Sequence, residues 1–157
     1  MASNRHLGRI LVLQTLYEYD FRKDCGDKAF DINDVLDRNI ARYHDTVDDQ
    51  EFIKNLVIGV TEQASNLDTT LQPIAPEWPI ADIARMDRIV LRMSLYELLK
   101  NKEVPPKVVI NEAVELSKAF GGDNSSKFIN GVLGTALRKY EDGSLEIPAG
   151  LNKKEKA

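Results

Sequence analysis

The chain has 157 residues, of which 43% are hydrophobic and 29% charged, a composition typical of a globular domain. It holds one cysteine and two histidines, too few for a disulfide framework or for a zinc site with the usual ligand spacing. No apolar run is long enough to cross a bilayer and the first residues carry no secretory signal, so we expect a cytoplasmic protein without membrane contacts.

Charge is unevenly distributed along the chain, although the net charge is only −4. Residues 25–84 hold four basic and twelve acidic side chains, whereas residues 85–139 hold ten basic and six acidic ones. Such an asymmetry can direct a polyanion to one surface of a protein that is acidic as a whole. The second half is therefore the better candidate for a binding surface.

Helical periodicity accounts for the first half of the chain, and no run of strict alternation indicates a strand. Residues 5–21 (RHLGRILVLQTLYEYDF) are apolar on most of the helix circumference and should form a central helix. Shorter apolar faces predict a second helix at 32–43 and a third from about residue 48 to about residue 71.

The segment PIAPEWP at 73–79 should separate two halves of the chain. Each of its three prolines lacks a backbone donor and disfavours a helical conformation in the preceding residue. Beyond this break, apolar spacing predicts helices at 82–101, 106–120 and 126–141. Pro106 suits a first helical turn, and one of Gly121 and Gly122 can take the left-handed conformation that follows many helices.

Together these elements predict an all-α chain of about seven helices. We assign a single domain at 1–141, with an N-terminal half at 1–72 and a C-terminal half at 79–141. Residues 142–157 are rich in Gly, Pro and Lys and have little to bury, so we expect a flexible C-terminal tail.

Sequence signals for catalysis are weak. The Gly121-Gly122 pair follows a helix and lacks the Lys-Ser/Thr pair that completes a phosphate-binding loop. The acidic residues Asp48, Asp49 and Glu51 stand where a helix should begin, and the helix dipole accounts for their position. We therefore expect no enzyme, no cofactor and no metal site.

One helix of the second half carries a stripe of arginines. Arg85, Arg88 and Arg92 are spaced so that their side chains fall within an arc of about 60° on the helix surface. If the stripe is solvated, it is a candidate nucleic-acid surface. The simpler alternative, which charge alone favours, is a solvated face whose arginines form ion pairs within the protein, for instance Asp82 with Arg85.

Two further cationic positions lie at helix starts. Arg5 and Arg9, one turn apart with His6 beside them, begin the first helix, where the helix dipole opposes basic groups. Lys127 and Phe128 place a cation beside an aromatic ring at the start of the last helix, a combination that holds unstacked RNA bases. Because a phenylalanine on an apolar face is more often a core residue, both interpretations of Phe128 stay open.

Three stretches carry a family resemblance: ADIARMDRIVLRMSLYELL, VPPKVVINEAVELSKAFGGDNSSKFINGVL and, more loosely, QTLYEYDF. They resemble the NusB family of bacterial transcription antitermination factors. The resemblance implies two helical bundles packed crosswise, no enzymatic activity, and binding of the single-stranded boxA RNA of ribosomal RNA leaders together with NusE, a small-subunit ribosomal protein. Such complexes help RNA polymerase to read through terminators and assist ribosomal RNA maturation, and some members form homodimers.

The resemblance also implies roles for individual residues. Carried over by position, the RNA surface comprises Arg5, His6, Arg9, Arg88, Arg92, Lys127 and Phe128. Tyr17 and Asp87 correspond to positions that face NusE. Family members often begin with several consecutive basic residues, whereas RHLGR holds only two arginines and a histidine, so RNA affinity without the partner should be low.

Asn111 and Asn130 stand beside apolar positions near the starts of two consecutive helices. A buried amide without partners costs about 1–3 kcal/mol. The interpretation favoured here is that each amide bonds backbone groups at the helix junction and so fixes the GGDNSS turn. A direct contact of Asn130 with an RNA base is the alternative.

Three classes of function follow. The leading hypothesis is an RNA-binding adaptor that acts with a NusE-like protein in the antitermination complex of RNA polymerase. The main alternative is a helical protein-interaction module without significant RNA binding. A third class is suggested by NusB-like domains fused ahead of ribosomal RNA methyltransferases, but we expect this chain to be too short for such a catalytic domain.

Overall fold

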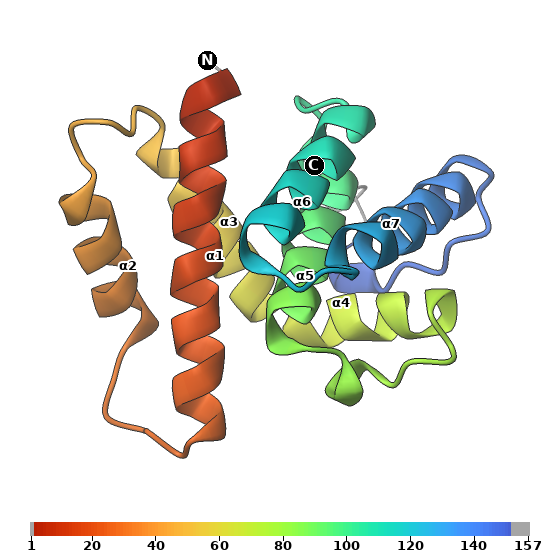
Figure 1. The fold of residues 1–157 in the computed structure, drawn as a ribbon, viewed down its shortest axis with the longest axis horizontal. Helices are drawn as coiled ribbons and strands as arrows, with labels where there is room; N and C mark the ends of the chain where they lie inside the picture. Colours follow the sequence, from red (N-terminus) through yellow and green to blue (C-terminus); the bar gives the residue numbers. More distant parts are fainter. Residues whose placement is uncertain (1, 152–157) are drawn as a thin grey trace. The chain divides into compact units, whose positions relative to one another are not determined.

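The computed structural model describes residues 2–151, with side chains from Arg5 onward, and this range is all-α (Figure 1). Its α-helices are α1 (Ala2–Asp24), α2 (Ile32–Arg42), α3 (Gln50–Glu62), α4 (Ala64–Leu71), α5 (Arg85–Lys100), α6 (Pro106–Phe120) and α7 (Ser125–Glu141). Short 3-10 helices are η1 (Gln72–Ile74), η2 (Ile80–Asp82) and η3 (Ala149–Leu151). The prediction of an all-α chain with about seven helices is confirmed.

The chain divides into two compact units, Met1–Thr61 and Glu62–Ala157. Sequence analysis placed the division later, at the proline-rich segment 73–79. The difference arises because α4, which precedes those prolines, packs against α5 and η1 and therefore belongs to the second unit.

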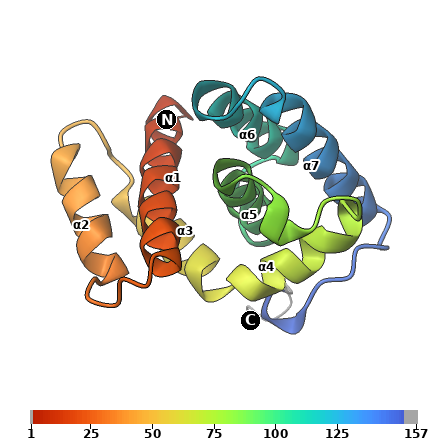
Figure 2. The same ribbon diagram turned by 60° about the horizontal axis from the view of Figure 1, so that its bottom comes forward.

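In the first unit, α1 and α2 lie side by side (Figures 1 and 2). Leu11, Val12 and Leu13 of α1 are all buried. Because successive helical residues point about 100° apart, α1 is buried on more than one side, as its sequence predicts. A buried hydrogen bond of 2.9 Å from Asn39 Nδ2 to Thr15 Oγ1 joins α2 to α1.

The contact between α1 and α3 depends on a glycine. A Cβ at Gly8 would lie 3.2 Å from Cγ1 of Ile53 and 3.6 Å from Cδ2 of Phe52. The absence of a side chain at Gly8 therefore lets the two helices approach closely, which places Phe52 next to the start of α1.

In the second unit, α5, α6 and α7 pack against one another and α4 packs against α5. The centre of this unit is apolar: Ile89, Leu95, Leu116 and Ile129 are at most 1% exposed. The single helix expected from about residue 48 to about residue 71 is interrupted at Gln63, whose φ of −105° and ψ of 13° leave the helical region. Neither glycine nor proline stands at the break, so sequence patterns missed it.

The segment after α7 differs from the expectation of a chain with little to bury. The Asp142 side chain accepts a hydrogen bond of 2.8 Å from the Ser144 backbone, which turns the chain after α7. Leu151 is then fully buried in η3, and η3 contacts α4 and α5. The rest of the predicted tail, residues 152–157, lies outside the described residues.

Candidate nucleic-acid interface

The turn between α6 and α7 is set by a close approach at Gly121. A Cβ there would lie 2.6 Å from Ser125 Oγ and 2.8 Å from the Ser117 carbonyl oxygen, distances that real side chains do not reach. The Ser125 hydroxyl accepts a 2.9 Å hydrogen bond from the Gly122 N–H and so closes the turn. The expectation that Gly121 or Gly122 is left-handed is wrong, since Gly121 has φ −98° and ψ −173° and Gly122 has no positive φ either. Gly121 is needed for space and not for a positive φ.

Asn111 and Asn130 do not hold this turn. Both side chains are exposed, and within the described part of the chain neither makes a hydrogen bond. The interpretation that their amides bond backbone groups at the helix junction is therefore wrong. Ser125 takes that role, because its hydroxyl lies next to the turn and accepts the hydrogen bond from the Gly122 N–H.

Lys127 and Phe128 occupy the first turn of α7, as expected from their position after the turn. Lys127 is exposed and, among the described residues, pairs with no acidic side chain. Phe128 is half-buried, and its ring meets the Trp78 ring edge to face, with 6.2 Å between centroids and an interplanar angle of 76°. Sequence analysis did not select Trp78 as a site residue. It is an aromatic residue within a proline-rich break, where no apolar helix face accounts for it.

The α5 arginines are engaged within the protein. Arg92 binds the Asp68 carboxylate with both Nε and Nη2 at 2.8 Å, and its side chain is only 15% exposed. Arg88 donates from Nη1 to the Ile83 carbonyl oxygen at 3.1 Å. A solvated stripe is thus the wrong description of Arg92, because α4 supplies an acidic partner that the spacing along α5 does not reveal.

The cationic start of α1 is also partly neutralised. Arg5 pairs with Asp49 at 3.0 Å and lies 4.5 Å above the Phe52 ring centroid. Arg9 is only 3% exposed, with its guanidinium 5.1 Å from the same ring, so it does not form the solvated patch that sequence analysis expected. His6 beside them is half-buried. Phe52 gathers both arginines because Gly8 lets α3 approach α1.

The Asp49 carboxylate is matched to this environment. The backbone N–H of Phe52 donates to it at 3.0 Å and Arg5 donates at 3.0 Å, and both donors hold the pKa of Asp49 below its ordinary value of 3.8. Asp49 therefore stays ionised at neutral pH and competes with any phosphate for Arg5.

The two residues implied to face a protein partner are both half-buried, Tyr17 in α1 and Asp87 in the first turn of α5. Asp87 Oδ1 is buried and has no hydrogen-bond partner among the described residues. Because that oxygen has no accessible surface, a partner would reach Asp87 only through the rest of its side chain.

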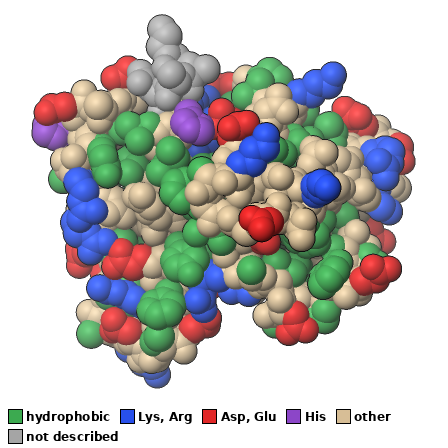
Figure 3. Space-filling model, in the orientation of Figure 1, with side chains coloured by type: hydrophobic (Ala, Val, Ile, Leu, Met, Phe, Trp, Pro, Cys, Tyr) green, Lys and Arg blue, Asp and Glu red, His purple; other side chains and the backbone are tan. Residues whose placement is uncertain are grey.

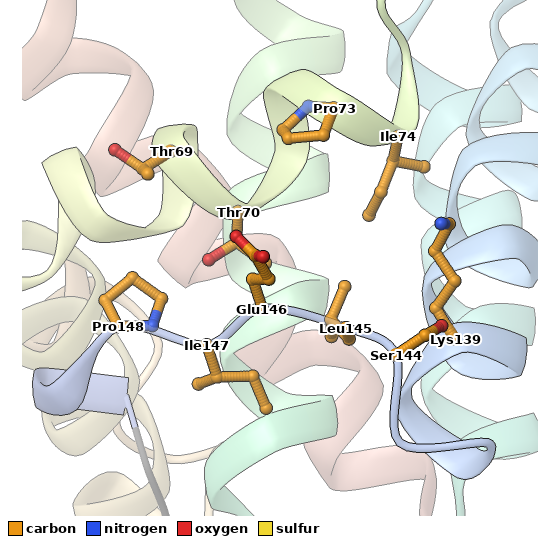
Figure 4. A pocket seen from close by; sticks show the side chains of 10 residues that line it. All are labelled: Thr69, Thr70, Pro73, Ile74, Lys139, Ser144, Leu145, Glu146, Ile147 and Pro148. Atoms are coloured by element: carbon orange, nitrogen blue, oxygen red, sulfur yellow. The ribbon is translucent and has the colours of Figure 1, made fainter.

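A pocket of about 490 Å³ lies in the second unit between η1 and the segment that follows α7 (Figure 4). Its remaining walls are apolar, and its polar side chains are those of Thr69, Thr70, Lys139, Ser144 and Glu146. The described residues hold no cluster of three His, Cys, Asp or Glu side chains that could bind a metal. The pocket holds none of the residues selected from the sequence.

The surface carries charges of both signs. Figure 3 shows Lys and Arg side chains interspersed with Asp and Glu on the face that it displays. None of the described helices is both long enough and apolar enough to cross a membrane. An exposed cation without an acidic partner is therefore more informative here than the total number of basic residues.

Comparisons with known proteins agree on one family. The model of the NusB family matches residues 6–138. The transcription antitermination protein NusB of Chloroflexus aggregans is 43% identical over 142 residues, which cover 89% of this chain and 91% of that protein. The solved structure of T. maritima NusB has a TM-score of 0.76 at 31% identity, covering 86% of this chain and 91% of that one.

A second solved structure has the same fold at lower identity. It is a crystal structure of the antitermination factors NusB and NusE in complex with double-stranded RNA. The matching chain has a TM-score of 0.76 at 22% identity and covers 89% of this chain and 100% of that one. At this identity the likeness concerns the fold alone.

Proposed function

Because the chain belongs to the NusB family, we propose that it is a non-enzymatic transcription antitermination factor that binds RNA together with a NusE-like protein. Its RNA is single-stranded and of boxA type, and its setting is the cytoplasmic antitermination complex of RNA polymerase, with a further role in ribosomal RNA maturation. The name of its Chloroflexus aggregans relative supports the role in antitermination. A NusB protein of the same fold has been crystallised with NusE and RNA.

The observation that carries the proposal is the start of α7. Lys127 is exposed without an acidic partner, and it directly precedes an aromatic ring that is only half-buried. A cation that can reach a phosphate beside a ring that can contact a base is the arrangement used by proteins that hold unpaired RNA.

The same geometry favours weak binding by the protein alone. Arg5 and Arg92 are paired with carboxylates and Arg9 is buried, so few of the proposed cations reach phosphates without rearrangement. Each phosphate contact to a single strand contributes about −0.7 to the slope of log affinity against log salt. The slope for the protein alone should therefore be shallow, no steeper than about −2 for three contacts.

The test is a titration of labelled boxA-type RNA and of a scrambled RNA of equal length, with and without a NusE-like protein, at several salt concentrations. We expect the partner to tighten binding of the boxA-type RNA more than that of the scrambled RNA, since charge alone would help both equally. Equal enhancement of both would reduce the effect to nonspecific polyanion binding.

A second candidate function is a helical protein-interaction module without significant RNA binding. The pairing of Arg5 with Asp49 and of Arg92 with Asp68 favours this candidate, because it leaves few basic side chains available to RNA. Binding of the NusE-like protein with no measurable RNA affinity in either condition would support this candidate and contradict the proposal.

A further inference from the structure

The side chain of Trp78 is 53% exposed, which makes it one of the few large apolar side chains of the described residues that face solvent. Tryptophan has the largest aromatic surface of any side chain, and burial of such a surface is strongly favourable. Phe128 covers only one part of the ring system, through the edge-to-face contact. A broad aromatic surface therefore stays open beside the first turn of α7.

The loop that carries Trp78 is held in place by one side chain. Gln72 Nε2 donates to the carbonyl oxygens of Ala75 at 3.3 Å and Trp78 at 3.0 Å, and Gln72 Oε1 accepts from the Ile80 N–H at 3.0 Å. Pro76 and Pro79 each fix a backbone φ angle within the same stretch. The exposed indole is thus presented by a restrained loop and not by a freely moving one.

Charge and hydrogen-bonding capacity at this corner suit a nucleic acid. Lys127, next to Phe128 in α7, is the exposed cation described above. The Trp78 indole N–H donates to no other described residue, so it can bind a base edge, a ribose hydroxyl or a phosphate. A strand of RNA presents phosphates and bases together, which suits an exposed cation beside a pair of aromatic rings.

We infer that Trp78 is a base-stacking residue, and that Trp78 and Phe128 form one aromatic corner that receives an unpaired RNA base while Lys127 contacts the adjacent phosphate. This inference rests on the proposed RNA-binding function and adds a residue from outside α5 and α7 to that surface. Base–aromatic stacking is tolerant of sequence, so the corner contributes affinity for single strands more than choice among them.

The test uses the intrinsic fluorescence of the protein, because Trp78 is its only tryptophan. The full chain is titrated with boxA-type RNA in the presence of the NusE-like protein while tryptophan emission is recorded. The emission of the same complex made with Trp78→Phe is subtracted, so that only the Trp78 signal remains. Stacking should quench Trp78, and the quenching should saturate at the RNA concentration at which labelled RNA is fully bound. Inorganic polyphosphate, a polyanion without bases, should leave the emission unchanged.

Three variants separate stacking from structure. Trp78→Leu should weaken RNA binding by about five- to hundredfold, the range measured for loss of one stacked base, whereas Trp78→Phe should lose only a few-fold. Phe21→Leu removes another exposed aromatic ring, 50% exposed in α1, and should leave RNA affinity unchanged. Thermal unfolding of each variant shows whether the chain still folds.

The outcomes separate the aromatic corner from the proposed RNA-binding function. RNA binding with no quenching and with full affinity in Trp78→Phe and Trp78→Leu overturns the aromatic corner and leaves the proposed function intact. Quenching by the NusE-like protein alone, with no further change on adding RNA, would make Trp78 a protein contact and also overturn it. No RNA binding by the wild-type complex contradicts the proposed function itself. If Trp78→Leu does not fold, the wild-type quenching and Trp78→Phe still decide.

Discussion

The basic side chains of α1 and α5 have different surroundings from Lys127 at the start of α7. Arg5 and Arg92 each have a carboxylate at 3.0 Å or less, and Arg9 is buried over an aromatic ring. Lys127 is exposed and has no such partner among the described residues. The arginines that look most basic in the sequence are therefore already paired or buried within the protein.

This difference teaches how basic residues should be interpreted. Spacing along a helix decides which face a cation occupies, but an acidic residue on another element decides whether it is available to a ligand. A cation that pairs internally costs more to recruit, because its ion pair must be broken before a phosphate is bound.

The largest effect should come from breaking the turn that presents the α7 corner. Gly121→Ala places a Cβ within 3.0 Å of Ser125 Oγ and the Ser117 carbonyl oxygen, and Ser117 is fully buried. We expect a loss of about 3 kcal/mol, the upper part of the range for overpacking, and a fall in melting temperature of about 6–12 °C. Calorimetry or thermal circular dichroism measures it.

The control for that variant is Gly131→Ala in α7, the helix that follows the turn. A Cβ at Gly131 meets nothing within 4 Å, so alanine should stabilise α7 by about 0.5–1 kcal/mol. If Gly121→Ala were as stable as Gly131→Ala, the close approach would not govern the turn.

The next effect concerns the internal pairing of Arg92. Arg92→Ala leaves the half-buried Asp68 without its bidentate partner, and we expect a loss of about 2 kcal/mol in the free energy of unfolding. Arg88→Ala removes a hydrogen bond to a carbonyl oxygen, which is weaker than a bidentate ion pair, and should cost less, about 1 kcal/mol. A double-mutant cycle with Asp68→Ala measures the coupling. An unchanged stability of Arg92→Ala with selectively weaker RNA binding would show that Arg92 leaves Asp68 for the RNA.

Lys127 should give the opposite pattern. Lys127→Ala removes an exposed side chain, so stability should change by less than about 0.5 kcal/mol. The slope of log RNA affinity against log salt should become shallower by about 0.7, the contribution of one phosphate contact to a single strand. Lys107→Ala removes an exposed lysine from the first turn of α6 and is the matched control. Equal slopes for both variants would remove Lys127 from the RNA surface.

The smallest effect should be the pH dependence of the Arg5–Asp49 pair. Because the Asp49 pKa is lowered in the folded chain, first by the Phe52 N–H and then by Arg5, the unfolded state takes up the proton first as the pH falls. The stabilisation is therefore present above about pH 4 and is lost below it, and it is small because the carboxylate is 41% exposed. In thermal unfolding, the stability of Asp49→Asn should not show this dependence on pH. Arg5→Gln should retain the larger part of the pH dependence, because the Phe52 N–H still donates to Asp49. An identical pH profile for Asp49→Asn and the wild type would contradict the assignment.

Sequence patterns located the helices better than the contacts between them. Helix α6 was predicted at its observed bounds, since Pro106 starts it and the glycine pair follows its last apolar position. The break at Gln63 was missed, because the apolar spacing continues across it through Leu67.

The candidate site shows the same limit. Lys127 and Phe128 were selected because they place a cation beside an aromatic ring at a helix start, and the structure places both in the first turn of α7. The partner of Arg92 lies 24 residues away on another helix, and no spacing rule connects the two. Asn130 was misjudged because a position one residue after the buried Ile129 is rotated about 100° around the helix, toward solvent.

The three hydrogen bonds of Gln72 have a consequence for the rates of RNA binding. A loop that is already fixed by Gln72 and two prolines needs little ordering when a strand arrives, so encounter should be limited by diffusion and charge. Salt and Lys127 should then act mainly on the association rate, and Trp78 mainly on the lifetime of the complex. Removing the Gln72 amide would make the two quantities change together, since the loop would have to order during each encounter.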